Sequence, residues 1–174
     1  TKEIALDMLS ANPKQQPKGA TGVRDRSGTV RAGRVASELN VQTPAQEGLG
    51  GAQVHVPKGS PLRANKRSAD GRLTVDLSYY PPNEKTLDAL PGNGTIGTGS
   101  RATRFAVVGY LNLRIRDAQG QAVSGITDRP EGSESLHTKA LLPNGAVHPT
   151  TGAPLRAGDQ LELFRYDAEA GVWH

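Results

Sequence analysis

The chain has 174 residues, enough for one domain of ordinary size, and its 21 Lys and Arg against 17 Asp and Glu give a net charge of +4. This mild, interspersed charge and the few aromatics (2 Phe, 4 Tyr and 1 Trp) argue against a nucleic-acid-binding face, which concentrates basic residues and stacking rings. The absence of cysteine excludes disulfides and thiolate chemistry, and no apolar run is long enough for a transmembrane helix.

The composition also predicts the kind of core. With 21 Gly, 12 Pro and 35% hydrophobic residues, the sequence favours a small aliphatic core carried by short strands and many turns. Residues 1–22 are expected to be a lead-in, with a short helix that ends at Asn12-Pro13 and a linker rich in Pro, Gly and Gln. Because the first residue is Thr, we expect the chain to be processed or cut from a longer protein. The domain itself is expected over residues 23–174.

Strand signals begin after this lead-in. Residues 28–32 and 35–43 predict two strands around Gly33, although residues 36–38 weaken the second. A flexible turn is expected over residues 46–51.

Residues 51–82 carry the clearest pattern, and the rest of the chain is expected to be organised around them. They predict two half-buried strands joined by a polar, turn-rich connection, because apolar and polar residues alternate in each. The second strand should end at Pro81 and Pro82, which cannot donate to a ladder. The positions expected to face the core are Ala52, Val54 and Val56 in the first strand and Leu73, Val75, Leu77 and Tyr79 in the second.

The middle of the chain contains the longest strand candidate. Residues 83–90 predict one or two helical turns capped by Asn83, and residues 92–100 predict a loop. Residues 104–117 then predict a core strand with two distinct faces. One face would carry Phe105, Val107, Leu111, Leu113 and Ile115, and the other Arg104, Tyr110, Asn112, Arg114 and Arg116.

The last third predicts short strands separated by turns. A turn is expected over residues 117–120, followed by strands over residues 121–126, 134–142 and 161–166, with a loop over residues 144–159 before the last strand. Short strands with no βα alternation predict an all-β fold, a two-sheet β-sandwich of the Ig-like or Greek-key type.

Five segments in this order carry a resemblance: VPKGSPL, GRLTVDLSYYPP, ALPGN, YLNLRIRDAQGQAV and HPTTGAPLRAGDQLELFRYDAEAGVW. Together they resemble a family of bacterial exported and cell-surface β-sandwich domains over residues 51–173. That family is distantly similar to the sandwich of cartilage intermediate-layer proteins and to the β-rich domain of ankyrins and netrin receptors. The resemblance implies an exported, multidomain parent and no activity, because the family shares no catalytic residues. The chain departs from the pattern at Asn93, where a second Gly is usual, and stops directly after the Trp, which suggests a missing strand or neighbouring domain.

No catalytic or metal-binding constellation emerges from the sequence. The four His lie far apart without ligand spacing, so we expect solvated or hydrogen-bonded imidazoles and no metal ion. The Asp residues fall mostly at turns, where they bond their own backbone, and Asp159 is expected to shape such a turn. The glycine-rich residues 92–100 lack the strand, helix and Lys-Ser/Thr pair of a phosphate loop, and Ser78 lacks a nucleophile elbow. We therefore expect no enzymatic activity and no cofactor.

One surface patch stands out, the basic face of Arg104, Tyr110, Arg114 and Arg116. A basic stripe with an aromatic can bind an acidic glycan or a protein partner, and the alternative is a solvated sheet face kept soluble by charge. Trp173 and Tyr166 could stack on a sugar, although a lone Trp near a strand start more often belongs to the core.

These observations predict a non-catalytic structural or adhesive module of a secreted, periplasmic or cell-surface bacterial protein. It would position neighbouring domains or bind a surface polymer, glycan or protein, with no nucleic-acid partner and no membrane insertion. One alternative is a carbohydrate-binding module, which requires solvent-facing aromatics in a planar row among Tyr79, Tyr80, Tyr110 and Trp173. The other is a protein-interaction module that presents an edge strand for β-augmentation.

Overall fold

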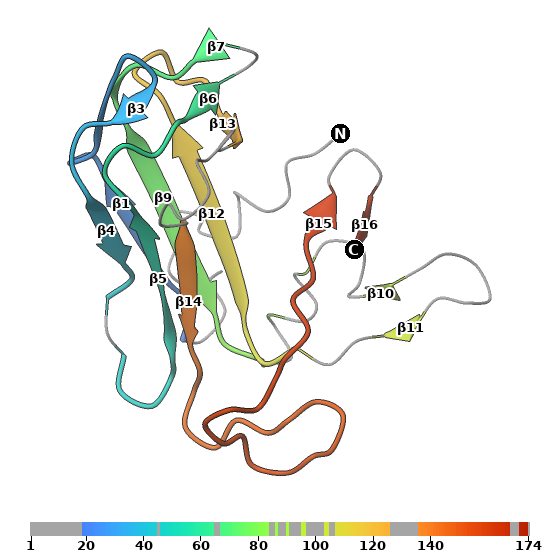
Figure 1. Cartoon of the computed structure of the whole chain (residues 1–174). Helices are drawn as coiled ribbons and strands as arrows, with labels where there is room; N and C mark the ends of the chain where they lie inside the picture. Colours follow the sequence, from blue (N-terminus) through green and yellow to red (C-terminus); the bar gives the residue numbers. More distant parts are fainter. Residues whose placement is uncertain are drawn as a thin grey trace.

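The computed structural model describes residues 19–44, 46–64, 67–83, 86, 90, 95–96, 103–104, 107–125, 136–167 and 171–173. The N-terminal helix and most of the linker expected over residues 1–22 lie outside these residues, as do most of the helical turns expected over residues 83–90 and most of the loop expected over residues 92–100. The prediction of an all-β fold is confirmed. Antiparallel sheets lie against one another without closing into a barrel, an arrangement consistent with the predicted β-sandwich (Figure 1). In the part of the chain described, no helix has the length and hydrophobicity to cross a bilayer.

The first layer of the sandwich is the antiparallel sheet β1-β9-β12. Its strands are β1 (Thr21–Asp25), β9 (Thr74–Tyr80) and β12 (Tyr110–Arg116). The register places Leu77 of the central strand between Val23 and Leu113, so apolar side chains of all three strands share the inner face. The outer face carries polar and aromatic residues, because side chains alternate along each strand.

The second layer is the antiparallel sheet β14-β5-β4, which packs on the first through the contact of β5 with β9 (Figure 1). Its strands are β4 (Leu39–Gln42), β5 (Gly51–Val56) and β14 (His137–Leu141). Thus the two strands of residues 51–82 are the central strands of opposite layers. They face each other across the core instead of pairing in one ladder.

The core forms where these layers meet. Every position predicted to face inward in the two central strands is fully buried. The opposite face of the second strand, predicted to be solvent-exposed, is so only in part: Thr74 and Asp76 remain partly exposed, whereas Ser78 and Tyr80 are buried. The core cluster contains Val30, Val35, Leu39, Val41, Ala52, Val54, Val56, Leu62, Ala64, Ala69, Leu73, Val75, Leu77, Tyr79 and Ile115.

Short sheets close one end of the sandwich and form the C-terminal region. Two three-stranded sheets lie at the closed end. One has the order β3-β2-β8, from β2 (Thr29–Arg31), β3 (Arg34–Val35) and β8 (Gly71–Arg72). The other has the order β13-β6-β7, from β6 (Arg63–Ala64), β7 (Arg67–Ser68) and β13 (Val123–Gly125). The C-terminal sheet has the order β11-β10-β16-β15, from β10 (Thr95–Ile96), β11 (Thr103–Arg104), β15 (Tyr166–Asp167) and β16 (Val172–Trp173).

The two strands predicted around Gly33 exist, but the second is divided. Ala32 and Gly33 both have positive φ, 49° and 76°, the backbone of a tight hairpin turn between β2 and β3. Ala36 N still donates to Thr29 O of β2 at 2.8 Å, and the chain leaves this hairpin after that bond. The chain thereby passes from the small sheet into β4 of the second layer.

The long strand predicted over residues 104–117 is also wrong as a single element. β12 begins at Tyr110, which lies opposite Tyr80, the last residue of β9. Pro81 follows Tyr80 and has no backbone N–H to donate, so β9 offers β12 no further hydrogen bonds beyond this point. Arg104 belongs to β11 in the C-terminal sheet instead.

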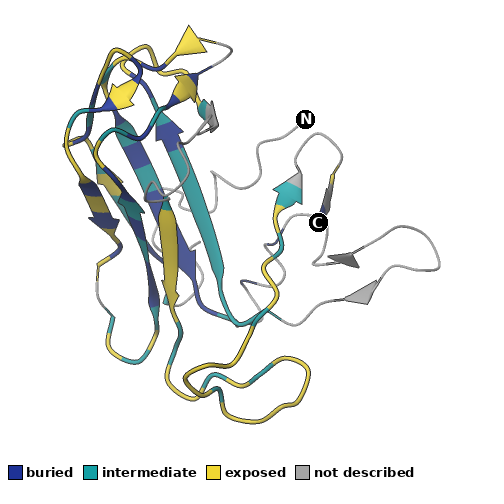
Figure 2. Cartoon of the chain, in the orientation of Figure 1, coloured by how far each residue is buried: buried dark blue, intermediate teal, exposed yellow. Residues whose placement is uncertain are grey.

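The strand predicted over residues 161–166 is largely wrong, because only Tyr166 enters a sheet, in β15. Residues 161–165 lie outside the strands that the structure describes, and the alternation of Leu161, Glu162 and Leu163 stops at Phe164. The strand predicted over residues 134–142 exists as β14, an edge strand of its sheet, and all five of its residues are exposed (Figure 2).

Candidate interaction surface

The basic face expected from the sequence is divided by the fold. Tyr110, Arg114 and Arg116 lie on the outer face of β12, as predicted, whereas Arg104 lies in another sheet. On the same outer face, Asp76 of β9 stands directly opposite Arg24 of β1 and Arg114 of β12. The four predicted residues therefore do not form one continuous stripe.

Asp76 forms ion pairs with two of the arginines on this face. Its Oδ1 accepts a hydrogen bond from Arg24 Nε at 2.5 Å, and its Oδ2 accepts one from Arg116 Nη2. The hydrogen bond to Asp76 and the negative charge of that carboxylate raise the pKa of Arg24 above its ordinary value. These contacts join all three strands of the layer, so the outer face is a cross-strand ion network.

The aromatic residues form a packed cluster beside this network. Tyr80 lies 5.5 Å from Tyr110 between ring centroids, Tyr110 lies 6.1 Å from Trp173, and Trp173 lies 5.3 Å from Tyr166. Trp173 is only 5% exposed, which confirms its predicted place in the core, and burial raises the pKa of Tyr80 to about 12. Because Tyr79, Tyr80 and Trp173 are buried, the planar row of exposed rings that a sugar-binding face requires is not formed by them.

Tyr79 fills the inner face at one end of the core. Burial raises its pKa to about 12, and its hydroxyl has no hydrogen-bond partner in the part of the chain that the structure describes. Gly50 makes room for this ring: a Cβ at Gly50 would lie 2.6 Å from Tyr79 Oη and 2.4 Å from Leu141 O. The contact is structural packing with no reactive geometry.

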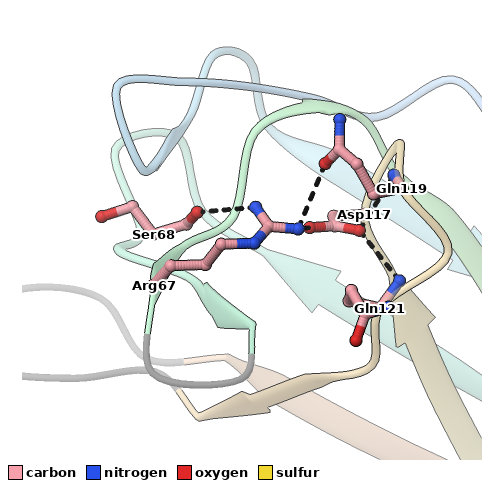
Figure 3. A network of polar contacts seen from close by, with 5 residues as sticks. All are labelled: Arg67, Ser68, Asp117, Gln119 and Gln121. Atoms are coloured by element: carbon pink, nitrogen blue, oxygen red, sulfur yellow. Dashed lines mark hydrogen bonds and ion pairs between the residues drawn. The ribbon is translucent and has the colours of Figure 1, made fainter.

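The turn after β12 is held by a buried carboxylate (Figure 3). The Asp117 side chain is 0% exposed, and its Oδ1 accepts hydrogen bonds from Gln119 N at 3.0 Å and Gln121 N at 2.9 Å. Its Oδ2 accepts a charge-assisted bond at 2.5 Å from Nη2 of Arg67, which also reaches Gln119 Oε1 at 3.2 Å. This network confirms the predicted turn and the predicted role of Asp at turns. It ties the β12–β13 connection to β7.

Asp159 and the described histidines also behave as predicted. Asp159 Oδ2 accepts a hydrogen bond from Arg156 N at 2.8 Å and closes a turn. His55 Nδ1 lies 2.8 Å from Asn40 Oδ1, and His148 Nδ1 accepts from Thr150 N at 3.2 Å. The rings of His55 and His137 stack with centroids 6.2 Å apart. Within the described ranges, no group of three or more His, Asp or Glu is placed to hold a metal ion.

An open groove of about 890 Å³ lies at the end of the sandwich where several loops meet. Leu49 and Val147, two large hydrophobic residues that remain exposed, are on its rim. Its described lining is apolar apart from two amides and contains no ionisable side chain. The lining consists of Gly48, Leu49, Pro81, Pro82, Asn83, Val107, Val108, Pro143, Asn144, Gly145, Ala146 and Val147.

The β14 edge, defined as the open side of residues His137–Leu141, is the most exposed regular element of the layer pair (Figure 2). On β5, Ala52 N donates to Thr43 Oγ1 and Ala52 O accepts from Thr43 N, and Thr43 lies on the β4 side. Because the main-chain groups of successive residues point to opposite sides of a strand, those of Gln53 and His55 face β14. Lys139 and His137 pair with those residues, and the N–H and C=O groups of Thr138 and Ala140 consequently point away from the sheet.

The sequence analysis missed this edge. Thr138 and Ala140 stand opposite the fully buried Val54 and Ala52, so they lie on the core-facing side of the sheet, yet both are exposed. The signal that could have identified the edge is Lys139, since Lys is a typical residue of exposed edge strands.

Comparison with protein-family models, with curated proteins and with solved structures finds no match to the chain.

Proposed function

We propose that the chain is a non-catalytic β-sandwich module that makes protein contacts by strand addition to the β14 edge. The observation that carries this proposal is the row of outward N–H and C=O groups at Thr138 and Ala140 on an exposed strand. Such an edge is a template for an added strand, in which main-chain hydrogen bonds supply affinity and alternate side chains supply specificity.

Two features support a role without catalysis. The groove at the loop end has no ionisable side chain in its described lining, whereas active sites place acids, bases or nucleophiles in such hollows. The buried or partly buried carboxylates Asp76 and Asp117 are both occupied in structural ion pairs. The exported, cell-surface setting and the role of positioning neighbouring domains are supported by the resemblance over residues 51–173.

The alternative of a carbohydrate-binding module receives less support. Tyr80, Tyr110 and Trp173 pack against one another, with Tyr80 and Trp173 buried. Sugar stacking uses ring faces open to solvent. The edge strand is the better candidate for the contact surface.

The proposal is tested by selecting strand-forming peptides from a random display library against the intact protein. The counter-screen is Ala140→Pro, which removes an outward N–H and is compatible with folding because proline is tolerated on edge strands where its nitrogen faces solvent. Ala140→Val is the matched control, since it keeps the N–H and favours a strand.

We expect the selected peptides to alternate apolar and polar residues, to bind the wild type and Ala140→Val alike, and to bind Ala140→Pro at least about tenfold more weakly because main-chain bonds are lost. Peptides without a strand pattern that bind Ala140→Pro equally well would overturn the edge as the contact surface. Turnover of a hydrolase substrate that one point mutation abolishes would overturn the non-catalytic role.

A further inference from the structure

The closed end of the sandwich, marked by β3 and β6 in Figure 1, carries a group of exposed basic side chains. We call this group the arginine face, and its members are Arg31, Arg34, Lys58, Arg63 and Arg72. All five are exposed, and none of them forms an ion pair with another residue that the structure describes. They come from separate parts of a sequence in which the two signs of charge are interspersed, so only the fold brings them together.

The alternation of side chains places three of the arginines on one side of the sheet β3-β2-β8. Val30 of β2 is buried, so its side of this sheet faces the core. Arg31 follows Val30 and therefore lies on the outer side, as does its pairing partner Arg34 of β3. On the other flank of β2, Arg72 of β8 pairs with Thr29 and shares that outer side.

Arg63 and Lys58 extend this surface beyond β3. Pro61 forms an antiparallel bridge with Arg34, so the chain around it runs alongside β3. Arg63 lies two positions after Pro61 and shares its outer side, because the intervening Leu62 is buried. Arg34 Nη1 donates at 3.0 Å to the carbonyl oxygen of the residue that follows Lys58. Basic side chains thus continue across neighbouring segments that lie about 4.8 Å apart.

This arrangement is unfavourable for the protein alone. Like charges that stand directly opposite each other on antiparallel strands destabilise the pair, and Arg31 and Arg34 occupy such positions. On the layer β1-β9-β12, by contrast, Arg24 and Arg116 share the carboxylate of Asp76. A surface that breaks a rule the rest of the fold follows is the pattern expected where a ligand supplies the missing charge.

We propose that the arginine face binds a carboxylated polysaccharide. Four of its five cations are arginines, whose planar fork of N–H donors matches a carboxylate in a bidentate pair. A polysaccharide with a carboxylate on successive sugars presents anions along an extended chain, as this face presents cations across successive strands. None of the five residues belongs to β14, so the inference does not depend on the proposed strand addition.

Other polyanions fit the arginine face less well. Proteins that hold single-stranded nucleic acids stack aromatic rings on the bases, and the five residues of this face include no aromatic side chain. Anionic membrane surfaces are bound by basic residues together with apolar side chains that insert beside them. The large hydrophobic residues that remain exposed in the described ranges lie in other segments of the chain.

The test is isothermal titration calorimetry with oligogalacturonates, which carry one carboxylate on each sugar, and with their methyl esters as the uncharged control. The test variant combines Arg31→Gln, Arg63→Gln and Arg72→Gln, because these side chains make no hydrogen bond with another described residue. The matched control removes the same charge from three other exposed positions, with Lys139→Gln, Arg156→Gln and Arg165→Gln.

We expect the wild type to bind the charged oligosaccharide and not its ester, with an affinity that falls as the salt concentration rises from about 20 to about 200 mM. The triple glutamine variant should bind at least about fivefold more weakly, because three exposed ion pairs are lost, and the matched control should stay within about twofold. Replacing the same three arginines by lysine should weaken binding about two- to threefold, since an ammonium group keeps the charge but has no planar fork.

Several results would overturn the inference. One is a protein that binds no oligogalacturonate at low salt, and another is a triple glutamine variant that binds as the wild type does. Equal weakening in that variant and in the matched control would show that the protein responds to net charge and has no site at the closed end. Tighter binding of single-stranded DNA or of vesicles with anionic lipid, lost in the triple glutamine variant, would overturn the polysaccharide as the ligand.

Discussion

Replacing Asp117 by Ala should destabilise the protein more than any exposed substitution in the chain. The substitution removes the acceptor of two backbone N–H groups, at Gln119 and Gln121, inside a site where the carboxylate is fully buried. An orphaned buried donor costs about 1–3 kcal/mol, and these two N–H groups are partly buried, so we expect a loss of about 2–4 kcal/mol in the free energy of unfolding. Arg67 is 44% exposed and regains water when its partner is lost, and its contribution to the loss is therefore smaller.

The magnitude is measured by urea denaturation of the wild type, Asp117→Ala, Arg67→Ala and Asp70→Asn. Arg67→Ala should cost about 1–2 kcal/mol, because Asp117 keeps its two backbone donors. Asp70 lies on the exposed surface nearby, and Asp70→Asn should stay within about 0.5 kcal/mol of the wild type. A cost below about 1 kcal/mol for Asp117→Ala, or a cost larger for Arg67→Ala than for Asp117→Ala, would refute the reasoning.

Three further predictions concern the core around the tyrosines. The contribution of Tyr79 and Tyr80 to the free energy of unfolding should be constant below pH 10 and fall as the pH rises from 10 to about 12, because the folded phenols keep their protons where the unfolded chain releases them. Each tyrosine contributes a slope of about 1.4 kcal/mol per pH unit, measured by urea melts across this range, and a flat profile would contradict the burial of the two phenols. Tyr79→Phe should leave thermal stability unchanged or raise it by up to about 1 kcal/mol, since the hydroxyl has no partner, and a loss above about 1 kcal/mol would show that it makes a hydrogen bond. Gly50→Ala should lower the free energy of unfolding by more than about 2 kcal/mol, because the residue has a φ of 87° and its Cβ would meet Leu141 O and Tyr79 Oη. Gly145→Ala is the control. Gly145 also has a positive φ but has open space around it, so this substitution should cost only about 1 kcal/mol in the same melts.

The alternation of residues in the two central strands was sufficient to identify the buried side of each. A period of two reports which side chains share a face, and Val54 and Leu77 are accordingly at the centre of the core. The same alternation cannot report which strand is the neighbour. It therefore did not show that β5 and β9 belong to opposite layers.

The candidate surface shows the same limit. The turn at residues 117–120 was predictable from its Asp and Gly, which bond or bend the local backbone. Arg67, the partner of Asp117, is 50 residues away in sequence, and only the fold brings the two together. The division of the basic face likewise follows from Pro81, which ends β9 and with it the ladder that β12 requires. Whether a strand lies at the edge of a sheet depends on the order of all its strands. The sequence of β14 itself therefore gave no sign of its exposed edge except Lys139.

The central claim is that Thr138 and Ala140 offer their main chain to a partner strand, and amide hydrogen exchange along β14 tests it most directly. In dilute protein the amides of Lys139 and Leu141, which bond to β5, should exchange slowly, and those of Thr138 and Ala140 should exchange rapidly. With a selected peptide bound, Thr138 and Ala140 should become protected while the other two stay unchanged. Rapid exchange at Thr138 and Ala140 under all of these conditions would contradict the account.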